Sequence, residues 1–319
     1  MKAVLVGLGR FGLGWYKRML KRGLLAAVVD SNPEMNDKLG DSGIPFYKSL
    51  EEALQRESID FIVNVTPPHI HMGINRIAFE RGIPVLCEKP IANDFGEAIE
   101  SVRLAERYNV PFMIAENYRF APNIRKLKQL IEEGAIGEIS EIDIRFHRYH
   151  PLKRNYPTHL LKDIGIHHLD MLRYLTGKEG VQIQAYLHKP VGSWEEEGAI
   201  LAAALTLELE GGIVASYTGT IASKAPATTW PGQWRIDGTK GSLECIQDSI
   251  YLTVDGERIS IEPLHAEQCP DCLQEFLDSL NEGRAGETSG KDYLRTQALV
   301  EFAEKSHQEG RRIAIDYTL

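Results

Sequence analysis

The segment Asp163-Ile164-Gly165-Ile166-His167-His168-Leu169-Asp170 carries residue types that could transfer a proton. On a helix, Asp163, His167 and Asp170 stand at positions i, i+4 and i+7 and therefore share one face. An imidazole, whose ordinary pKa is about 6.5, can take and return a proton near neutral pH. Asp163, one turn before His167, could hold a neighbouring hydroxyl group of a substrate or pair with a lysine.

Two other interpretations of this helix stay open. Its polar face could be a capped, partly exposed surface with incidental hydrogen bonds between histidine and aspartate side chains. Three such groups could in principle also ligate a metal ion, although we expect no metal site in this chain. His168 points to another side of the helix and is expected to be structural.

Lys89 is a second candidate for chemistry. It follows the apolar segment Pro84–Cys87 and precedes Pro90, whose ring disfavours helical backbone at Lys89. An ammonium group at the end of a buried strand could stabilise the negative charge that develops on an alcohol oxygen. The alternative is a solvated loop lysine.

A glycine-rich turn near the start of the chain has the types and spacing that bind a dinucleotide. The motif at 7–12 follows the short apolar run 2–6 and opens an amphipathic stretch that ends near Arg22. The first glycine permits a tight turn, the second lets backbone N–H groups approach a pyrophosphate, and the third lets the helix pack closely. The diphosphate would rest on the positive N-terminus of the helix. The predicted contacts are Gly7, Leu8, Gly9, Arg10, Phe11 and Gly12.

The next apolar run, 24–29, ends at Asp30, 18 residues after Gly12. An acidic residue about 20 residues after the glycines accepts a hydrogen bond from the ribose 2′-hydroxyl. A carboxylate there would repel a 2′-phosphate, and Ser31 and Asn32 follow with no nearby arginine or lysine to receive one. NAD is therefore favoured over NADP as the cofactor, with Asp30 and Ser31 as contacts.

Alternating strands and helices must position these groups in the first part of the chain. We expect strands near 2–6, 24–29, 61–65, 84–87 and 111–115, with helices near 12–22, 68–81 and 94–108. Such alternation predicts right-handed crossovers and a parallel sheet. Because parallel strands end at one edge, Thr66, Pro67, Glu88 and Asn117 should lie with the glycine turn and Lys89.

The rhythm changes after about residue 119. Apolar residues at 142, 144 and 146 alternate with polar ones, which is typical of a half-buried strand. A helix near 160–175 is followed by closely spaced strands near 181–188, 199–209, 213–220, 233–237, 242–246 and 250–254. Helices near 272–281 and 290–308 precede a last strand at 312–316. The sequence therefore predicts an α/β protein with a dinucleotide-binding domain (1–118) and an α+β domain (119–319) that contains a large, mostly antiparallel sheet.

Composition limits the partners and the location. The formal charge of −9 over 319 residues argues against nucleic acid or a membrane surface as a partner. No apolar run approaches the roughly 20 residues of a membrane span. The chain start carries no signal-peptide pattern, so we expect a cytoplasmic protein. Cys87 and Cys245 are expected to be buried thiols, and the Cys269-Pro-Asp-Cys272 spacing is interpreted as coincidence because no second ligand pair follows.

Five motifs together resemble one large family of oxidoreductases. In chain order they are the 7–12 turn, Thr66-Pro67-Pro68-His69-Ile70-His71, Glu88-Lys89-Pro90, Asn117-Tyr118-Arg119-Phe120 and Asp163-x-Gly165-x-His167-x-x-Asp170. Their order and spacing are similar to those of the glucose-fructose oxidoreductase, inositol dehydrogenase and rhizopine-catabolism (Gfo/Idh/MocA) family. Segments 136–139 and 238–243 and the closing helix pair extend the resemblance over nearly the whole chain.

The resemblance implies a Rossmann domain followed by an α/β domain whose open sheet commonly makes homodimer or homotetramer contacts. It also implies NAD(P)-dependent oxidation or reduction of a sugar, cyclitol or related polyol. By motif position, Lys89 and His167 match the family's catalytic pair, and Asp163 matches its substrate-orienting carboxylate. The positions near the cofactor are Thr66, Pro67, His71, Glu88 and Asn117.

The approach to the catalytic segment departs from the family. Relatives often carry a small glycine cluster where this chain has Tyr156-Pro157-Thr158-His159-Leu160, so no particular sugar is carried over. The segment before Asp163 is rich in polar aromatic rings and also carries an arginine. These residues could bind a phosphorylated or acidic sugar, or they could simply belong to an exposed polar loop. They are Tyr149, His150, Arg154, Tyr156 and His159. Trp230 and Trp234 could stack on a sugar or pack at a strand end. The predicted substrate contacts are Arg119, Tyr149 and Trp230.

Three functions remain under consideration. The leading one is an NAD-dependent sugar or polyol dehydrogenase. The second is a non-catalytic NAD-binding regulator, against which the joint presence of Lys89, Asp163 and His167 argues. The third is glycosidic cleavage in which NAD oxidises and then re-reduces the substrate, with no net NADH formed.

Overall fold

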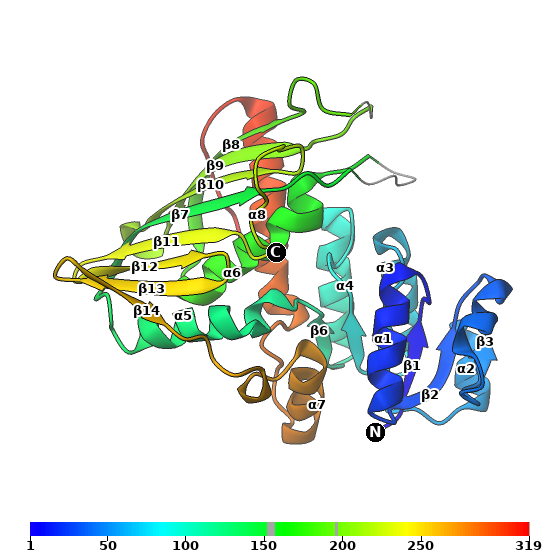
Figure 1. Ribbon diagram of the computed structural model, residues 1–319. Helices are drawn as coiled ribbons and strands as arrows, with labels where there is room; N and C mark the ends of the chain where they lie inside the picture. The colour runs from blue at the N-terminus through cyan, green and yellow to red at the C-terminus, as the bar shows by residue number, and fades with distance from the viewer. Residues whose placement is uncertain (152–156, 195–196, 319) are drawn as a thin grey trace. The chain divides into compact units, whose positions relative to one another are not determined.

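The computed structural model describes residues 1–151, 157–194 and 197–318. By its internal contacts the chain forms two compact units, Met1–Glu116 with Cys272–Leu294 and Asn117–Asp271 with Arg295–Leu319. Each unit has its own β-sheet (Figure 1). The functional boundary at residue 118 stays a prediction.

The first unit contains a six-stranded sheet whose paired strands all run parallel. Its order, β3-β2-β1-β4-β5-β6, is that of a doubly wound dinucleotide-binding fold. Strands β1, β4, β5 and β6 consist of buried residues, as expected for a sheet covered on both faces. The predicted parallel sheet is confirmed. The strands are β1 (Ala3–Val6), β2 (Leu25–Val29), β3 (Phe46–Tyr47), β4 (Phe61–Asn64), β5 (Val85–Cys87) and β6 (Phe112–Ile114).

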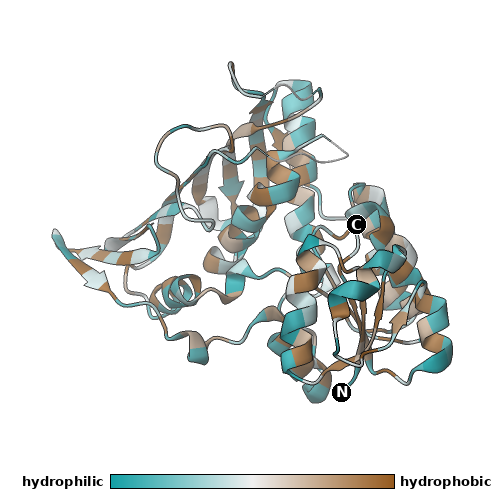
Figure 2. Ribbon diagram, turned by 45° about the vertical axis from the view of Figure 1, so that its right-hand side comes forward, coloured by the Kyte–Doolittle hydropathy of each residue, from teal (hydrophilic) through white to brown (hydrophobic). Residues whose placement is uncertain are grey.

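Amphipathic helices cover this sheet. Figure 2 shows the apolar strands in brown inside helices whose outer surfaces are largely teal. The 3-10 helix Pro33–Leu39 and helix α2 were not predicted, because both are too short to repeat an apolar pattern. Ser49 begins α2 by accepting a hydrogen bond from the Glu52 N–H at 3.2 Å. The helices are α1 (Arg10–Lys21), α2 (Leu50–Arg56), α3 (Pro68–Phe79), α4 (Phe95–Arg107) and α7 (Cys272–Glu282).

The late segment Cys272–Leu294 completes this first unit. The Phe276 ring of α7 packs edge-on against the Phe61 ring of β4, with centroids 5.6 Å apart. Beyond α7, the Thr288 hydroxyl donates to the Ile114 carbonyl at 2.6 Å. The Tyr293 hydroxyl lies 3.2 Å from the buried Glu116 carboxylate. The parallel sheet therefore depends on residues far along the chain.

The second unit contains a nine-stranded sheet in the order β14-β13-β12-β11-β7-β10-β9-β8-β15. All paired strands run antiparallel except β7 and β10, so the predicted mostly antiparallel sheet is confirmed. Strand β14 was not predicted, since its residues are largely exposed. The strands are β7 (Ile139–His147), β8 (Gly180–His188), β9 (Ala202–Leu209), β10 (Val214–Thr220), β11 (Gln233–Gly238), β12 (Gly241–Ile246), β13 (Ser249–Val254), β14 (Glu257–Ile261) and β15 (Ile313–Ala314).

Buried and exposed residues alternate along β8, β9 and β10, so one face of this sheet is covered and the other faces outward. Helix α6 (Ile166–Thr176) lies on the covered face, as does the later part of α8 (Gly290–Glu309) (Figure 1). Helix α5 (Pro122–Glu132) belongs to the same unit and was not predicted. The fully buried Trp234 and Phe146 belong to the core beneath these helices.

Candidate active site

The glycine turn has a separate physical reason for each of its three glycines. Gly7 has a φ of 95°, and a Cβ there would lie 2.7 Å from the Val65 carbonyl oxygen. A Cβ on Gly12 would lie 2.1 Å from the Gly7 carbonyl oxygen, so only glycine lets α1 begin this close to the turn. At Gly9, no atom of the described residues lies within 4 Å of a Cβ position, which leaves room for a ligand.

Helix α1 begins with backbone donors available to a ligand. Within the described chain, no side chain caps it at Gly9, and its first turn has no acidic residue. Uncapped N–H groups at the positive end of a helix bind phosphate. Arg10 and Phe11 are exposed beside them, Phe11 at 71%. The turn therefore fits the pyrophosphate of a dinucleotide.

Asp30 is tied to the glycine turn. Its Oδ2 accepts from the Leu8 N–H at 2.7 Å, and its Oδ1 accepts from the Asn32 N–H at 2.9 Å. Each carboxylate oxygen can accept a second hydrogen bond, so the group can still receive ribose hydroxyls. Ser31 lies exposed next to it. Asp30 thus supports the turn and can also bind the ribose.

A pair of glycine substitutions in α1 tests this geometry. Gly12→Ala should lower the free energy of unfolding by about 1–3 kcal/mol, because the new methyl group overlaps the Gly7 carbonyl. Gly14→Ala is the matched control in the same helix, where nothing in the described chain lies within 4 Å. That control should gain up to about 1 kcal/mol in helix propensity. Equal effects in denaturant titrations would contradict the close approach of α1 to the turn.

The Lys89 loop is held by a residue that sequence reasoning missed. The Trp15 indole N–H of α1 donates to Glu88 Oε1 at 2.8 Å, and Glu88 Oε2 accepts from the Lys89 N–H at 3.2 Å. Trp15 is 6% exposed. Its position on the buried side of α1 was predictable, but its partner was not, because Glu88 is far away in sequence. One carboxylate therefore fixes the backbone of Lys89 to the glycine-turn helix.

His71 joins two loops of the same unit. Its ring is fully buried, with Nδ1 2.9 Å from the Pro90 carbonyl oxygen and Nε2 2.8 Å from the Thr66 carbonyl oxygen. Burial lowers the pKa of His71 and outweighs these two contacts, which favour the protonated ring. The Thr66 hydroxyl donates to Asn64 at 2.7 Å, and Pro67 precedes α3. His71 thus acts on the loops at the strand ends and offers no exposed ring to a ligand.

The helix that carries the Asp–His segment does not begin as an α-helix. Residues Leu161–Gly165 form a π-helical turn, in which the Ile166 N–H donates to the Leu161 carbonyl, and α6 follows directly. A Cβ on Gly165 would lie 2.7 Å from Leu161 Cδ2 and 3.3 Å from the Tyr217 hydroxyl. The predicted helix at 160–175 is confirmed, and its first turn, which carries Asp163, is π-helical and therefore wider than the predicted α-helical turn.

His167 lies in the first turn of α6 and is 6% exposed. Its ring stacks on the Tyr118 ring, with centroids 4.2 Å apart and planes inclined by 19°. Tyr118 follows Asn117, the first residue of the second unit, in the 3-10 turn Tyr118–Phe120. Asp163 is half-buried in the π-helical turn. The stacking partner Tyr118 belongs to the Asn117-Tyr118-Arg119-Phe120 motif but was not among the predicted site residues.

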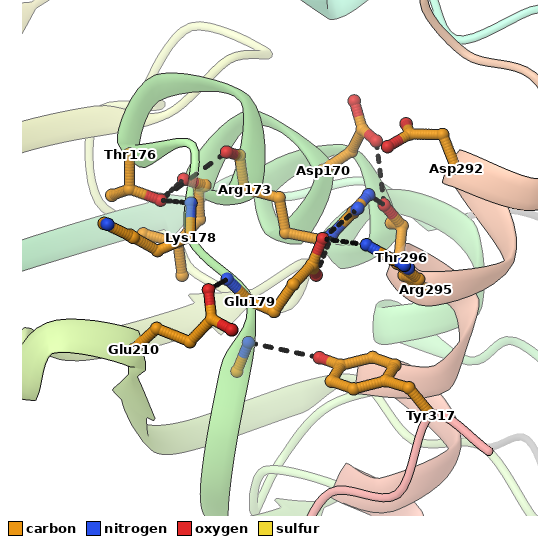
Figure 3. A network of polar contacts seen from close by, with 12 residues as sticks. Asp170, Arg173, Thr176, Lys178, Glu179, Glu210, Asp292, Arg295, Thr296 and Tyr317 are labelled. Carbon is orange, nitrogen blue, oxygen red and sulfur yellow. Dashed lines mark hydrogen bonds and ion pairs between the residues drawn. The ribbon is translucent and has the colours of Figure 1, made fainter.

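Arg119 lies 5% exposed and bonds to Asp170, three residues after His167. Its Nε and Nη2 donate to the two Asp170 carboxylate oxygens at 2.6 and 2.7 Å. The Thr296 hydroxyl of α8 also donates to Asp170, at 2.8 Å (Figure 3). Arg119 and Asp170 thus form a fully hydrogen-bonded buried pair that fixes the turn beside α6.

The same polar network continues along α6. Arg173 donates to the Thr296 hydroxyl at 2.8 Å and to both carboxylate oxygens of Glu179 at 2.7 Å (Figure 3). Arg295 reaches the same carboxylate at 3.1 Å. Burial raises the pKa of Glu179, but the hydrogen bonds and charges of the two arginines outweigh it and hold the pKa below its ordinary value. The network anchors α6 to α8 within this unit.

His168 is structural, as predicted. It is fully buried, with Nδ1 3.2 Å from the Tyr217 hydroxyl of β10 and Nε2 2.9 Å from the Trp230 carbonyl oxygen. A ring that donates from Nε2 can accept the tyrosine hydroxyl proton at Nδ1. His168 therefore connects α6 to the loop that carries Trp230.

The two candidate substrate aromatics are exposed in this unit, Tyr149 at 56% and Trp230 at 38%. The Arg148 guanidinium lies 4.5 Å from the Trp230 ring centroid. The Trp194 ring meets Tyr149 edge-on at 6.0 Å. Trp234, by contrast, is 2% exposed and donates to the Pro231 carbonyl at 2.7 Å, so it packs at a strand end.

The other polar residues that precede Asp163 differ in their surroundings. Arg154 and Tyr156 lie outside the described residues. His159 Nε2 lies 2.7 Å from Glu304 Oε1, which Lys162 also approaches at 3.0 Å. The His150 ring meets the Trp230 ring edge-on at 5.1 Å. His159 therefore helps fix the π-helical turn before α6 to α8.

The four cysteines are free thiols. Cys87 and Cys245 are buried as predicted, and burial raises the pKa of Cys245 to about 12. In the part of the chain that the structure describes, no three His, Cys, Asp or Glu side chains are grouped so as to hold a metal ion. No helix among the described residues is long and apolar enough to cross a bilayer.

Two family descriptions match the chain. Residues 1–116 match the oxidoreductase family with an NAD-binding Rossmann fold, and residues 124–244 match the GFO/IDH/MocA C-terminal domain. A D-apiose dehydrogenase from Rhizobium rhizogenes is 27% identical, over 99% of this chain and 97% of the relative. An inositol 2-dehydrogenase from Rhizobium meliloti is 25% identical, over 98% of each chain.

A solved structure shares the fold. An oxidoreductase from Agrobacterium radiobacter, in complex with NAD+, L-tartaric acid and magnesium, superposes with a TM-score of 0.90. The two chains are 24% identical, and the match covers 100% of this chain and 99% of the other. This oxidoreductase therefore has the same fold as the present chain.

Proposed function

Because the chain belongs to the GFO/IDH/MocA family of NAD-binding oxidoreductases, we propose that it transfers a hydride between NAD and a CH–OH carbon of a sugar, cyclitol or related polyol. The observation that carries the proposal is that the chain retains Lys89, Asp163 and His167 together, each on a structured support. Lys89 is fixed through Glu88, and His167 is stacked in the first turn of α6.

All but one of the proposed cofactor contacts belong to the first unit; the exception is Asn117. The uncapped start of α1 would hold the diphosphate through Gly7, Leu8, Gly9, Arg10, Phe11 and Gly12. Asp30 and Ser31 would contact the ribose. Further cofactor contacts are proposed near the ends of the strands. His71 would act indirectly, by joining the loops of Thr66 and Pro90. The proposed residues are Thr66, Pro67, His71, Glu88 and Asn117.

The proposed chemistry gives a separate role to each of three side chains. When bound, NAD supplies the nicotinamide carbon that accepts or returns the hydride. The His167 imidazole takes the hydroxyl proton as the alcohol is oxidised and returns it in the reverse direction. The Lys89 ammonium stabilises the negative charge on that oxygen, and the Asp163 carboxylate holds a neighbouring hydroxyl.

The substrate class of the proposal rests on the relatives and on the second unit. The relatives named above are dehydrogenases of D-apiose and of inositol, both polyhydroxylated compounds. Exposed aromatic rings bind the apolar faces of such compounds. We therefore propose that Tyr149 and Trp230 contact the substrate, whereas Arg119, held by Asp170, would act by shaping the turn beside His167.

Assembly and location complete the proposal. A homodimer or homotetramer formed through the exposed face of the nine-stranded sheet is proposed, in the cytoplasm. Light scattering after size-exclusion chromatography would measure the mass, and charge substitutions at the exposed positions Tyr186 and Val214 should dissociate the assembly. A monomeric mass in the parent protein would contradict it.

A substrate screen tests the reaction. Aldoses, inositols, uronic acids and sugar phosphates would be mixed with NAD or NADP, and NADH or NADPH absorbance followed. Net reduced cofactor with one of these classes supports the dehydrogenase. Binding of NAD without turnover of any compound would indicate a regulator, and release of a sugar from glycosides without NADH accumulation would indicate cleavage.

Asp30→Asn tests the cofactor preference. Asparagine keeps an acceptor for the Leu8 N–H but removes the negative charge, so Kd for NAD should rise about tenfold while Kd for NADP falls. Calorimetric titration with both nucleotides would measure the two constants. Asp60→Asn, which alters a carboxylate that accepts from the Lys2 N–H, is the matched control. Tighter binding of NADP than NAD by the parent protein would contradict the role of Asp30.

A further inference from the structure

We infer that Tyr118 is a positioning residue that orients the His167 ring by stacking on it, an inference that rests on the proposed acid–base role of His167. The two rings lie in near-parallel planes, inclined by 19°, with centroids 4.2 Å apart. Both residues belong to the second unit, so the contact is internal to one compact body.

The need for such a contact follows from the torsions of histidine. Rotation about the bond to the imidazole ring is a soft, broad torsion, so packing must select the plane of the ring. Proton transfer requires a ring nitrogen within hydrogen-bond reach of the hydroxyl group. A flat aromatic ring against one imidazole face limits rotation of that plane while leaving the ring edge, which carries both nitrogens, outside the stack.

Tyr118 can serve as this support because its own backbone is fixed. The next residue, Arg119, is bonded through two nitrogens to Asp170, which lies in α6 three residues after His167. Phe120, the last residue of the 3-10 turn, is 5% exposed and has the Arg125 guanidinium 4.6 Å from its ring centroid. The turn and the helix are therefore joined twice, once by the ion pair and once by the stacked rings.

The near-parallel geometry assigns the orienting contact to the ring face of Tyr118. Phenylalanine keeps the flat ring and loses only the hydroxyl group, whereas leucine keeps apolar volume but has no flat face. Tyr118→Phe should therefore retain the parent kcat within about twofold, and Tyr118→Leu should lower kcat by about 10- to 100-fold with little change in KM. A role limited to folding or substrate binding would not give this split between the two variants.

Nuclear magnetic resonance of the free protein tests the contact without any turnover. The His167 Hε1 proton lies beside an aromatic face, so its resonance should move downfield in Tyr118→Leu and stay near the parent position in Tyr118→Phe. His167→Ala identifies the resonance. Tyr251→Leu is the matched control, because it removes a ring of β13 that contacts Arg258 of β14, away from the helix that carries His167. Its kcat and the His167 resonance should not change.

The outcomes separate the two proposals. Full activity in His167→Ala would overturn the proposed acid–base role of His167, while the resonance shifts would still report whether the rings stack; absence of turnover in the parent protein would overturn the proposed function. An unchanged His167 resonance in Tyr118→Leu would overturn the stacking itself. Equal loss of kcat in Tyr118→Phe and Tyr118→Leu would assign the effect to the hydroxyl group and overturn the inference. If Tyr118→Leu does not fold, a large loss of kcat or a shifted His167 resonance in Tyr118→Phe would still overturn the inference.

Discussion

Replacing His167 with alanine should slow hydride transfer by about 10²- to 10⁴-fold, which is the usual contribution of a general acid–base group. His167 lies nearly buried in the first turn of α6, so a methyl group leaves the hydroxyl proton without its acceptor. The measurement is single-turnover formation of NADH with saturating substrate. Because the variant changes none of the proposed cofactor contacts, its Kd for NAD should equal that of the parent protein.

Two further variants sharpen this result. Lys89→Ala should also slow hydride transfer, by about 10²- to 10³-fold, since it removes charge stabilisation of the alcohol oxygen. His188→Ala is the control, because this histidine lies on β8 of the same unit and contacts the Tyr186 ring at 5.2 Å. Unchanged single-turnover rates in both His167→Ala and Lys89→Ala would contradict the assignment of the catalytic pair.

Replacing Arg119 with alanine should lower the free energy of unfolding by about 3–5 kcal/mol. The substitution removes the guanidinium that donates to both oxygens of the Asp170 carboxylate, whose side chain is 0% exposed. Thr296 continues to donate one hydrogen bond, which cannot offset a buried charge. Denaturant titrations followed by two optical probes would measure the loss and show whether the two units unfold together.

Arg145→Ala is the matched control for this ion pair. Arg145 bonds to Asp143 at 2.7 Å in the same unit, but its side chain is 62% exposed, so its removal should cost about 0–1 kcal/mol. Similar losses in the two arginine variants would show that the Arg119–Asp170 pair is not effectively buried. Such a result would also weaken the argument that the turn of Tyr118 is rigid.

The elements with strong local patterns were predictable. Short apolar runs separated by amphipathic stretches predicted the parallel sheet, and the glycine spacing predicted a turn in which Gly7 and Gly12 have no room for a side chain. The alternation along β7 predicted a half-buried strand. In each case the information lies within about ten residues of sequence.

The supports of the candidate site were not predictable in this way. Trp15 is bonded to Glu88, and Arg119 to Asp170, across long separations that no local pattern encodes. The π-helical turn before α6 has the composition of an ordinary helix, so no local pattern predicts it. Contacts between distant residues therefore fix the positions of the candidate side chains. The local sequence indicates only which side chains are candidates.

The segment Cys272–Leu294 gives the first unit an unusual order of synthesis. A ribosome that has translated residues 1–116 has produced every strand of the parallel sheet, but not the Phe276 ring that covers Phe61 or the Thr288 hydroxyl that bonds to Ile114. An exposed apolar strand edge or face attracts other chains. The strands of the nucleotide-binding unit precede the other unit in the sequence, but this unit should be among the last parts of the nascent chain to become protease-resistant. Pulse proteolysis of arrested ribosome complexes would measure this order.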